Sequence, residues 1–482
     1  MKRLLPLAAA LLAGCTVGPN YSRPETPVPP GYAEAHAPAG ATDAELALWW
    51  QRFADAQLAT LVNRALAQNL DVQTAAARIR EARAQERVAG ASALPEVSAQ
   101  GSVTRQRISE HAIPAPPGAV QGGGGPGSFA LPGTEFTTFR VGFDASWEVD
   151  LFGRNRRQIE AASARTGAAI WDRRDVQLSV AAEVADAYLA LRSLQQRIAI
   201  AEEEVRRQQR SASLVAARVR GGLVTGQDLE QQRSSLASAE AAIEPLQAQA
   251  AARIHALGVL TGDTPEALIA ELSPTAALPS PPVVPAGLPS DLLRRRPDIR
   301  AAERELAAAT ADIGVATAEL YPSFSLSAAP ALVSTALGSL LEWGSRAFTV
   351  GGALDWPIFD GGRRRANIEV TNARQEQALI AYRKTILTAL QDVEDALSEI
   401  DNDRSQLAKL EQALGNAARA EDIAGTRYRG GLVTYSDVLQ AQANRISLEG
   451  QVIETRGAIA RDTVALAKAL GGGWPELAEA QP

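Results

Sequence analysis

The chain contains one eight-residue segment twice in nearly the same form, as Arg218-Val219-Arg220-Gly221-Gly222-Leu223-Val224-Thr225 and as Arg427-Tyr428-Arg429-Gly430-Gly431-Leu432-Val433-Thr434. Each copy ends a long stretch, residues 155–220 and 363–429, that lacks proline and is rich in alanine, leucine, glutamine and arginine. This composition favours helix. About 65 residues at a rise of roughly 1.5 Å each would make a rod about 100 Å long.

Both copies also carry the signals of a turn between two helices. The paired glycines suit the C-terminal end of the long helix. The threonine that closes each copy is followed three residues later by Asp228 or Asp437, a spacing that resembles a capping box. We therefore expect two antiparallel helical hairpins, with returning helices over about 226–257 and 435–470.

The similarity extends well beyond this segment. Asn69-Leu70-Asp71-Val72 corresponds to Arg296-Pro297-Asp298-Ile299, and Leu94-Pro95 corresponds to Tyr321-Pro322. These echoes predict a tandem repeat, with units at 55–273 and 288–470, a proline-rich linker at 274–287 and a tail at 471–482. The first unit has extra glycine-rich residues at 111–133, which predict a long exposed loop.

Between the helices of each unit, apolar and polar residues alternate with a period of two. The alternation is clearest over 136–150 and 347–359, and weaker partners at about 96–108 and 322–330 precede these two stretches. Shorter helices over 55–89 and 291–316 lead into them, so each unit is of αββα type. Strands of about eleven residues are long enough to cross a bilayer when tilted. A hairpin of a soluble β-sandwich would show the same alternation.

Four strands are too few to close a membrane barrel, because such barrels have eight strands or more. An open sheet edge is not tolerated in lipid. If the strands cross a membrane, several chains must therefore combine their hairpins, and the protein must be an oligomer.

Aromatic and basic residues cluster where the second and fourth strands end. The aromatic residues predict a girdle at the membrane interface, with core packing as the alternative: Trp147, Phe152, Trp356 and Phe359. The arginines that follow would reach lipid phosphates, with a solvated surface as the alternative: Arg154, Arg156, Arg157, Arg363, Arg364 and Arg365.

The start of the chain predicts export. Lys2-Arg3 and the apolar run 4–13 are typical of a signal peptide, here residues 1–14. Cys15, the only cysteine, follows Leu12-Ala13-Gly14 and resembles the lipidation site of a bacterial lipoprotein, so residues 15–54 would be a lipid-anchored extension. A signal peptide that merely contains a cysteine is the alternative. Thr16 is compatible with transport to the outer membrane.

Composition excludes several classes of function. The net charge of −7, from 48 basic and 55 acidic residues, does not favour nucleic-acid binding. One methionine and three histidines leave little to hold a metal. No nucleophile, base and orienting residue have the spacing of a catalytic set, so we expect neither an enzyme nor a cofactor beyond the lipid on Cys15.

Four motifs carry a family resemblance that covers nearly the whole chain: Cys15–Tyr21 with Pro24, Leu288–Glu303, Tyr321-Pro322 and Pro357–Gly362. They resemble the outer membrane factor family, the channel proteins of tripartite efflux and secretion systems. The match is specifically to the lipoprotein branch that is attached to resistance-nodulation-division pumps.

This resemblance implies a mainly helical protein with a membrane β-barrel, located in the outer membrane of a Gram-negative bacterium. Three chains would form a twelve-stranded barrel continuous with a twelve-helix periplasmic tunnel. The homotrimer would conduct drugs or other small toxic compounds passively. A periplasmic adaptor and an inner-membrane proton-driven pump would be its partners and would supply the energy.

The resemblance also gives the hairpin tips two roles. Adaptor docking falls on Gly221, Gly222, Leu223, Val224, Gly430, Gly431, Leu432 and Val433, for which local turn packing is the alternative. A periplasmic gate falls on Asp228 and Asp437, with Arg429, Tyr428 and Tyr435 as bonding partners, because rings of carboxylates select cations. Helix capping is the alternative for both aspartates. Gln440 stands where related proteins often have a further aspartate.

Two other functions remain open from the residues. One is a channel for type I polypeptide secretion, although the lipidation motif favours the small-molecule branch. The other is a structural envelope lipoprotein, although such a brace would not need strands with a lipid-facing side.

Overall fold

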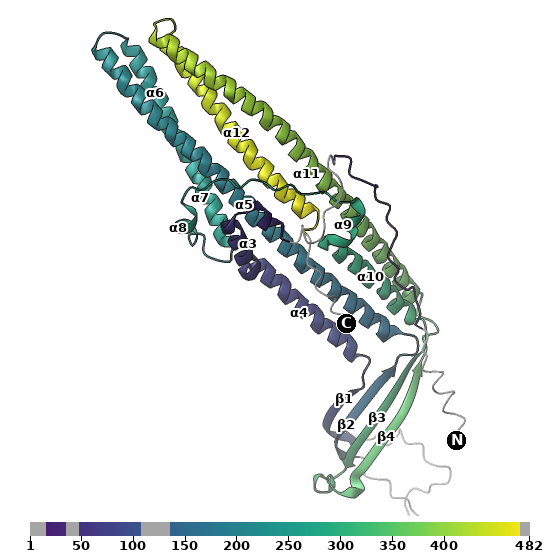
Figure 1. Ribbon diagram of the computed structural model, residues 1–482. Coiled ribbons are helices and arrows are strands. Elements are labelled where there is room, and N and C mark those ends of the chain that lie inside the picture. The colour runs from purple at the N-terminus through teal and green to yellow at the C-terminus, as the bar shows by residue number, and fades with distance from the viewer. Residues whose placement is uncertain (1–15, 35–47, 108–134, 473–482) are drawn as a thin grey trace, which may run out of the picture. The chain divides into compact units, whose positions relative to one another are not determined.

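The computed structural model describes residues 16–34, 48–107 and 135–472 (Figure 1). Cys15, the expected signal peptide, the glycine-rich segment 111–133 and residues 473–482 of the expected tail lie outside the described residues. The chain divides into two compact units, which are described separately. One comprises residues up to 22, 82–165 and 306–377, and the other contains the rest.

The first unit is built on a β-sheet. Among the described residues, four antiparallel strands lie in chain order, β1 (Glu96–Arg107), β2 (Glu135–Val149), β3 (Ser323–Ser334) and β4 (Arg346–Asp355) (Figure 1). The unit also contains the ends of four helices that adjoin these strands: α4 (Leu70–Ala91), α5 (Arg154–Arg220), α10 (Pro297–Ala318) and α11 (Arg363–Arg429). All four helices connect to the same end of the sheet. Helices α4 and α10 lead into β1 and β3 at that end, and β2 and β4 return to it before α5 and α11.

The strand register places the apolar residues of the sheet on one face. Phe143 pairs with Ala99, Trp147 with Leu326, and Val350 with Ala328. Directly opposed residues point to the same side of a sheet, so the apolar face is lined by Val97, Val103, Phe139, Val141, Phe143, Trp147, Val149, Phe324, Leu326, Leu332, Phe348, Val350 and Leu354. The other face presents Ser98, Gln100, Ser102, Arg140, Asp144, Ser325, Ser327, Thr349 and Asp355.

None of the described residues covers this apolar face. Phe348 is 80% exposed and Val350 is 74% exposed. Strands β1 and β4 form the two edges of the sheet, and neither has a partner on its outer side among the described residues. Within the part of the chain that the structure describes, the face and the edges are therefore both open to partners.

Two strands differ from their predicted bounds. β3 continues to Ser334, although its alternation is obscured by Ala328-Ala329-Pro330. β4 spans Arg346–Asp355, so the prediction that it reaches residue 359 was wrong. Pro357 has no N–H to donate to a strand ladder, and the aromatic residues Trp356 and Phe359 consequently lie beyond the strand end.

The second unit is mainly helical. It contains the outer parts of the four helices named above together with α3 (Ala56–Gln68), α6 (Gly226–Ala241), α7 (Ile243–Leu260), α8 (Ile269–Leu272), α9 (Pro289–Arg295) and α12 (Tyr435–Ala469). Its core packs Trp49, Leu58, Tyr188 and Leu257 against one another. Asp55 caps α3 by accepting two backbone N–H bonds, and it also accepts a bond of 2.8 Å from the Tyr188 hydroxyl.

The long helices agree closely with the expected ranges, whereas three predicted helices are divided. Residues 226–257 form α6 and α7, because Pro245 removes a backbone donor and its ring crowds the preceding turn. Residues 55–89 divide at Asn69, whose side chain accepts bonds from the N–H groups of Asp71 and Val72. Residues 291–316 divide at Arg296, which is extended before Pro297.

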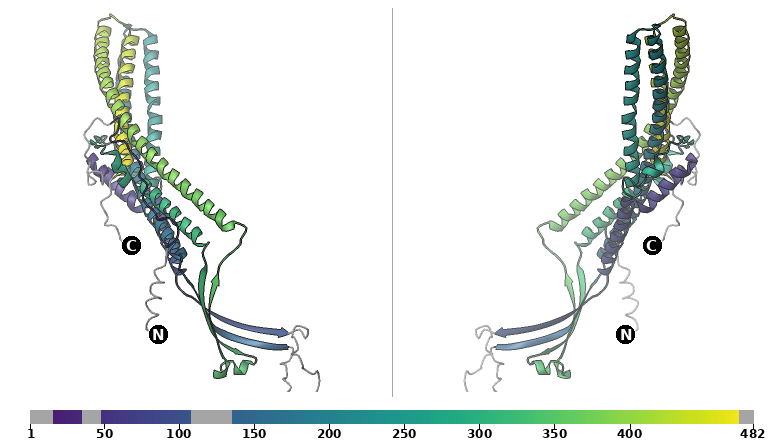
Figure 2. Two further views of the ribbon diagram at one scale, coloured as in Figure 1. Left: turned by 90° about the vertical axis from the view of Figure 1, so that its right-hand side faces the viewer. Right: turned by 90° about the vertical axis from the view of Figure 1, so that its left-hand side faces the viewer.

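Helices α5 and α11 have 67 residues each, and α4 and α10 have 22 residues each. Figure 2 shows α11 and α12 as continuous rods that meet at their hairpin tip. In the part of the chain that is described, no helix is both long enough and apolar enough to cross a membrane.

Helices α5 and α12 pack closely together at Gly457. A Cβ added there would lie 2.6 Å from Ser193 Oγ and 2.9 Å from Ser193 Cβ. We expect Gly457→Ala to destabilise the protein, because overpacking typically costs about 1–3 kcal/mol. Gly450→Ala is the matched control in the same helix, since a Cβ there meets no atom within 4 Å. Thermal unfolding of both variants measures the difference, and equal midpoints would contradict this packing.

Candidate functional site at the hairpin tips

The two hairpin tips have the same backbone geometry. After α5, the N–H of Leu223 donates to the Arg218 carbonyl at 2.9 Å, and after α11 the N–H of Leu432 donates to the Arg427 carbonyl at 2.9 Å. Gly222 and Gly431 have φ values of 69° and 74°. This is the Schellman ending of a helix, whose left-handed position favours glycine.

The returning helices begin with the predicted caps. Asp228 accepts bonds of 3.0 Å from both the N–H and the hydroxyl of Thr225, and its own N–H donates back to that hydroxyl. Asp437 accepts bonds of 2.8 and 2.7 Å from the N–H and the hydroxyl of Thr434. These bonds lower the pKa of the Asp437 carboxyl. Capping by both aspartates is therefore confirmed, while gating by them remains a proposal.

The tip leucines are the exposed part of the turns. Leu223 is 75% exposed and Leu432 is 77% exposed. Val224 instead packs against a small core formed by Val215, Tyr435 and Val438. Of the residues expected to dock an adaptor, the two leucines thus project outward, and Val224 supports the turn from inside.

Tyr435 joins the two hairpins. Its buried hydroxyl donates to the Gln232 side-chain oxygen and also hydrogen-bonds to the Ser211 hydroxyl. Burial raises the pKa of Tyr435. The centroids of the Tyr428 and Tyr435 rings lie 5.1 Å apart. The guanidinium of Arg218 lies over the Tyr428 ring, 5.4 Å from its centroid.

Arg429 bonds within its own helix, to the Gly425 carbonyl at 3.2 Å and to the Thr426 hydroxyl at 3.1 Å. In this single chain, the expected gate residues therefore fall into two groups. Tyr428 and Tyr435 meet between the hairpins, whereas Asp228, Asp437 and Arg429 bond to neighbours in sequence.

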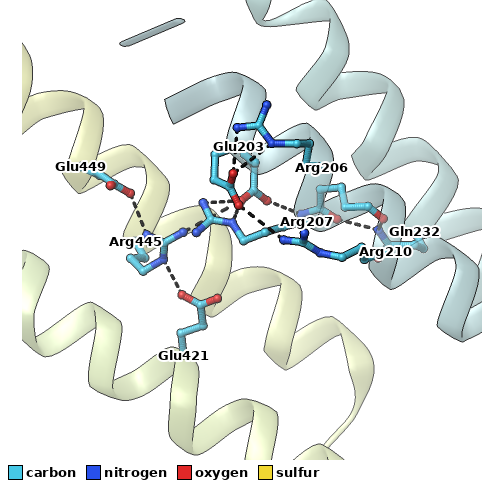
Figure 3. Close-up of polar contacts among 10 residues, drawn as sticks. Glu203, Arg206, Arg207, Arg210, Gln232, Glu421, Arg445 and Glu449 are labelled. Carbon is cyan, nitrogen blue, oxygen red and sulfur yellow. Dashed lines mark hydrogen bonds and ion pairs between the residues drawn. The ribbon is translucent and has the colours of Figure 1, made fainter. Parts of the chain in front are cut away.

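A polar layer deeper between the hairpins was missed from the sequence (Figure 3). The fully buried Gln232 of α6 donates to the Gln208 side chain of α5 at 2.6 Å, and Gln208 donates to Glu204 at 2.5 Å. Arg445 of α12 lies 4.0 Å from Glu204 and pairs with Glu421 of α11 at 2.5 Å. The layer thus involves all four hairpin helices. In the sequence these residues look like an ordinary solvated helix face.

The expected aromatic girdle lies in the sheet unit. Trp147 donates its indole N–H to the Ala93 carbonyl at 3.0 Å, and Phe152 stacks on Tyr321 at 4.8 Å. Trp356 and Phe359 are exposed, the latter by 91%. Trp147 and Phe152 therefore make local contacts, whereas Trp356 and Phe359 present apolar surface that no described residue covers.

The arginines next to this girdle are mostly engaged in ion pairs. Arg154 pairs with Glu148 at 2.7 Å, and Arg364 pairs with Asp360 at 3.2 Å. Arg157 is buried, and its guanidinium donates to the Val17 carbonyl at 3.2 Å. The expectation that Arg157 reaches lipid was therefore wrong.

Arg157 instead holds the N-terminal segment against the sheet unit. It donates to the Asn20 side chain at 2.7 Å, and the N–H of Val17 donates to the Phe152 carbonyl at 3.1 Å. Thr16 lies so close to Gly153 that a Cβ on this glycine would be 2.7 Å from the threonine methyl group. The residue that follows Cys15 is consequently fixed where β2 leads into α5.

Across the described ranges, no group of three or more His, Cys, Asp or Glu side chains is arranged to hold a metal ion.

Loss of the Tyr435 hydroxyl should weaken the contact between the hairpins. Tyr435→Phe leaves the buried Gln232 oxygen without this donor, which costs about 1–3 kcal/mol. Tyr428→Phe is the matched control, because the buried Tyr428 hydroxyl has no hydrogen-bond partner among the described residues. Chemical unfolding and hydrogen exchange of the hairpin amides measure both variants. An effect of Tyr435→Phe no larger than that of the control would contradict the assignment.

Known proteins resemble this chain over nearly its whole length. The family model described as outer membrane efflux protein matches residues 61–263 and 288–472. Pyoverdine export outer membrane protein OpmQ of Pseudomonas aeruginosa is 35% identical over 479 residues, which cover 98% of this chain and 97% of that protein. Cation efflux system protein CusC of Escherichia coli is 32% identical over 98% of this chain and 99% of its own length. The solved outer-membrane channel OprN has a TM-score of 0.85 at 33% identity, covering 95% of this chain and 100% of that one.

Proposed function

The chain belongs to the outer membrane efflux protein family, and we propose that three copies of it form one continuous exit duct. It is an outer-membrane component of an efflux system, and it serves as the exit duct of that system. Proteins of this family are channels rather than enzymes. The comparisons do not favour polypeptide secretion or a purely structural envelope role.

The uncovered apolar face of the sheet carries the trimer proposal. In water this face would leave Phe348 and Val350 without partners, and in lipid the open edges of β1 and β4 would leave backbone groups unpaired. Edge-to-edge pairing of several chains satisfies the open edges, and the lipid around the closed sheet then covers the apolar face. Three chains give twelve strands, the number that the family resemblance implies, with the polar face turned toward the lumen.

A lipid on Cys15 fits this arrangement. The contacts of Arg157 and Gly153 hold residues 16–20 at the end of the sheet that leads into the helices. A lipid attached one residue earlier would then enter the bilayer beside the interfacial aromatic residues. The anchor and the barrel would share one membrane surface.

The hairpin tips are the proposed contact with a periplasmic adaptor, which connects the duct to a proton-driven pump of the inner membrane. Leu223 and Leu432 are apolar, strongly exposed and held on turns of identical geometry. Two equivalent apolar knobs on each chain suit a partner that presents repeated grooves between its own helices.

The substrate proposal is a range of drugs or other small toxic compounds. Relatives of comparable identity are named for different exported species, pyoverdine for OpmQ and cations for CusC. The polar face of this sheet offers serine, threonine, glycine and aspartate together with a few other charged residues, which do not form a selective binding site. Selection by the pump rather than by the duct follows from this lining.

Tip docking is tested in a host strain that lacks this chain. Deletion should raise the sensitivity to antibiotics, dyes and detergents, and the wild-type gene should restore resistance. Leu223→Asp combined with Leu432→Asp should fail to restore it while leaving trimers intact in the outer membrane, because a charge would be buried at each tip contact. Leu214→Asp is the control, an exposed leucine on α5 away from the turn. Full resistance with the double variant would refute docking at the tips.

Gating by the tip aspartates is tested by single-channel conductance. Asp437→Asn keeps a side chain that caps α12 but removes a negative charge from each chain. If the three carboxylates restrict the pore, the variant should change cation selectivity and conduct more readily. Conductance and selectivity equal to the wild type would assign Asp437 to capping alone.

A further inference from the structure

The apolar face of the sheet ends in a defined set of polar residues on the side remote from the helices. On each strand, one polar residue of this face comes directly beyond the last apolar one. These polar residues are Arg105 beyond Val103 on β1, Thr137 beyond Phe139 on β2, Ser334 beyond Leu332 on β3 and Arg346 beyond Phe348 on β4. Arg107 follows on β1. We call these five residues, Arg105, Arg107, Thr137, Ser334 and Arg346, the collar.

The strand register puts the collar at one depth. Val103 pairs with Phe139, whereas Leu332 pairs with Val141, and Phe348 pairs with Pro330. The apolar boundary thus moves by two residues from β2 to β3 and by two more from β3 to β4. Across the three strand spacings from β1 to β4, about 4.8 Å each, the boundary shifts by four residues of about 3.3 Å along the strands. The boundary therefore slopes by about 40° relative to the perpendicular to the strands. Membrane strands tilt by about 35–45°, so this boundary lies level in a bilayer.

The charges of the collar are confined to the lipid-facing side. At the same end of the sheet, the polar face presents only uncharged residues among those described, Thr104, Gln106, Phe136, Thr138, Val333 and Ala347. The nearest charges on that face are Arg140 and Asp144, which pair at 3.5 Å within β2. A role in the lumen would place the collar arginines on the opposite face.

The collar has an excess of accessible positive charge. Arg105 and Arg107 have side chains that are 75% and 70% exposed, and they share the single carboxylate of Glu135 at 3.0 and 3.8 Å. Arg346 lies 3.2 Å from the centroid of the Trp343 ring and donates to the carbonyl of that residue at 2.7 Å. The three guanidinium groups are therefore balanced by only one carboxylate among these contacts, and Trp343 holds the guanidinium of Arg346 in place.

We propose that the collar binds the phosphate groups of lipid A in the outer leaflet of the outer membrane. This inference rests on the proposed function, because the barrel sets which end of the sheet faces outward. The helices join the opposite end, so the collar lies where outer-leaflet headgroups meet their acyl chains. Lipid A carries phosphates at that level, and guanidinium groups bind phosphate through paired hydrogen bonds.

The two ends of the collar meet where chains adjoin. Arg346 belongs to the edge strand β4, and Arg105 and Arg107 belong to the other edge strand, β1. Antiparallel pairing of β4 with β1 of the next chain brings these arginines together at each boundary. The site would thus be complete only in the oligomer, with the hydroxyl of Thr137 as a further donor between the boundaries.

The test compares lipid A retained by purified trimers, measured by native mass spectrometry in detergent with added bisphosphorylated or dephosphorylated lipid A. Combined Arg105→Gln, Arg107→Gln and Arg346→Gln should weaken binding of the bisphosphorylated lipid by about tenfold or more, since several charge-assisted bonds are lost. Arg140→Gln is the control on the polar face and should bind as the wild type does. The wild type should bind the dephosphorylated lipid as weakly as the triple variant binds the phosphorylated one.

Conductance in planar bilayers separates this proposal from the proposed function. The triple variant should form channels like those of the wild type, which shows that the barrel is intact. Lipid A binding by the triple variant as strong as that by the wild type would overturn the proposal. The same holds if Arg140→Gln loses as much binding as the triple variant, or if the wild type binds dephosphorylated lipid A as tightly as the bisphosphorylated form. Absence of channels with the wild type itself would instead contradict the exit duct.

Discussion

The cost of an unpaired backbone group in lipid is the constraint on which this structure depends. Each N–H or C=O left open in hydrocarbon costs several kcal/mol. In the described ranges the sheet has two open edges beside an uncovered apolar face. No rearrangement within one chain satisfies both features. The oligomer that we propose would meet this condition, because pairing of β1 with β4 of a neighbouring chain leaves no open edge.

The helical part is not under this constraint, because in water the backbone groups at its turns can bond to caps or to solvent. Two glycines with positive φ end α5 and α11, and two Thr-Asp pairs begin the returning helices. Backbone geometry and caps therefore define these turns, and Leu223 and Leu432 project from them. Deeper in the bundle, Glu204, Gln232 and Arg445 join the hairpins by buried polar contacts, which are directional and break when the helices separate.

Much of this architecture could be predicted from local sequence signals. Strict alternation around Phe143 and Val350 marks the strands, and the Gly-Gly-Leu-Val-Thr segments mark the tips, because each signal has a direct backbone cause. The helix breaks at Asn69 and before Pro245 were missed, since a single cap or proline is easily overlooked in a long helical pattern. The burial of Arg157 and the polar layer at Gln232 could not be predicted, because both depend on contacts between residues far apart in the sequence.

The most direct measurement is the accessibility of β4 in the outer membrane, residue by residue. Single cysteines at positions 347–354 can be labelled individually, because Cys15 is the only native cysteine and is expected to be acylated. Lipid-soluble quenchers should reach labels at Phe348, Val350, Gly352 and Leu354, and water-soluble quenchers should reach those at Ala347, Thr349, Gly351 and Ala353. Uniform accessibility to water along the strand would contradict a lipid-facing sheet, and with it the shared barrel.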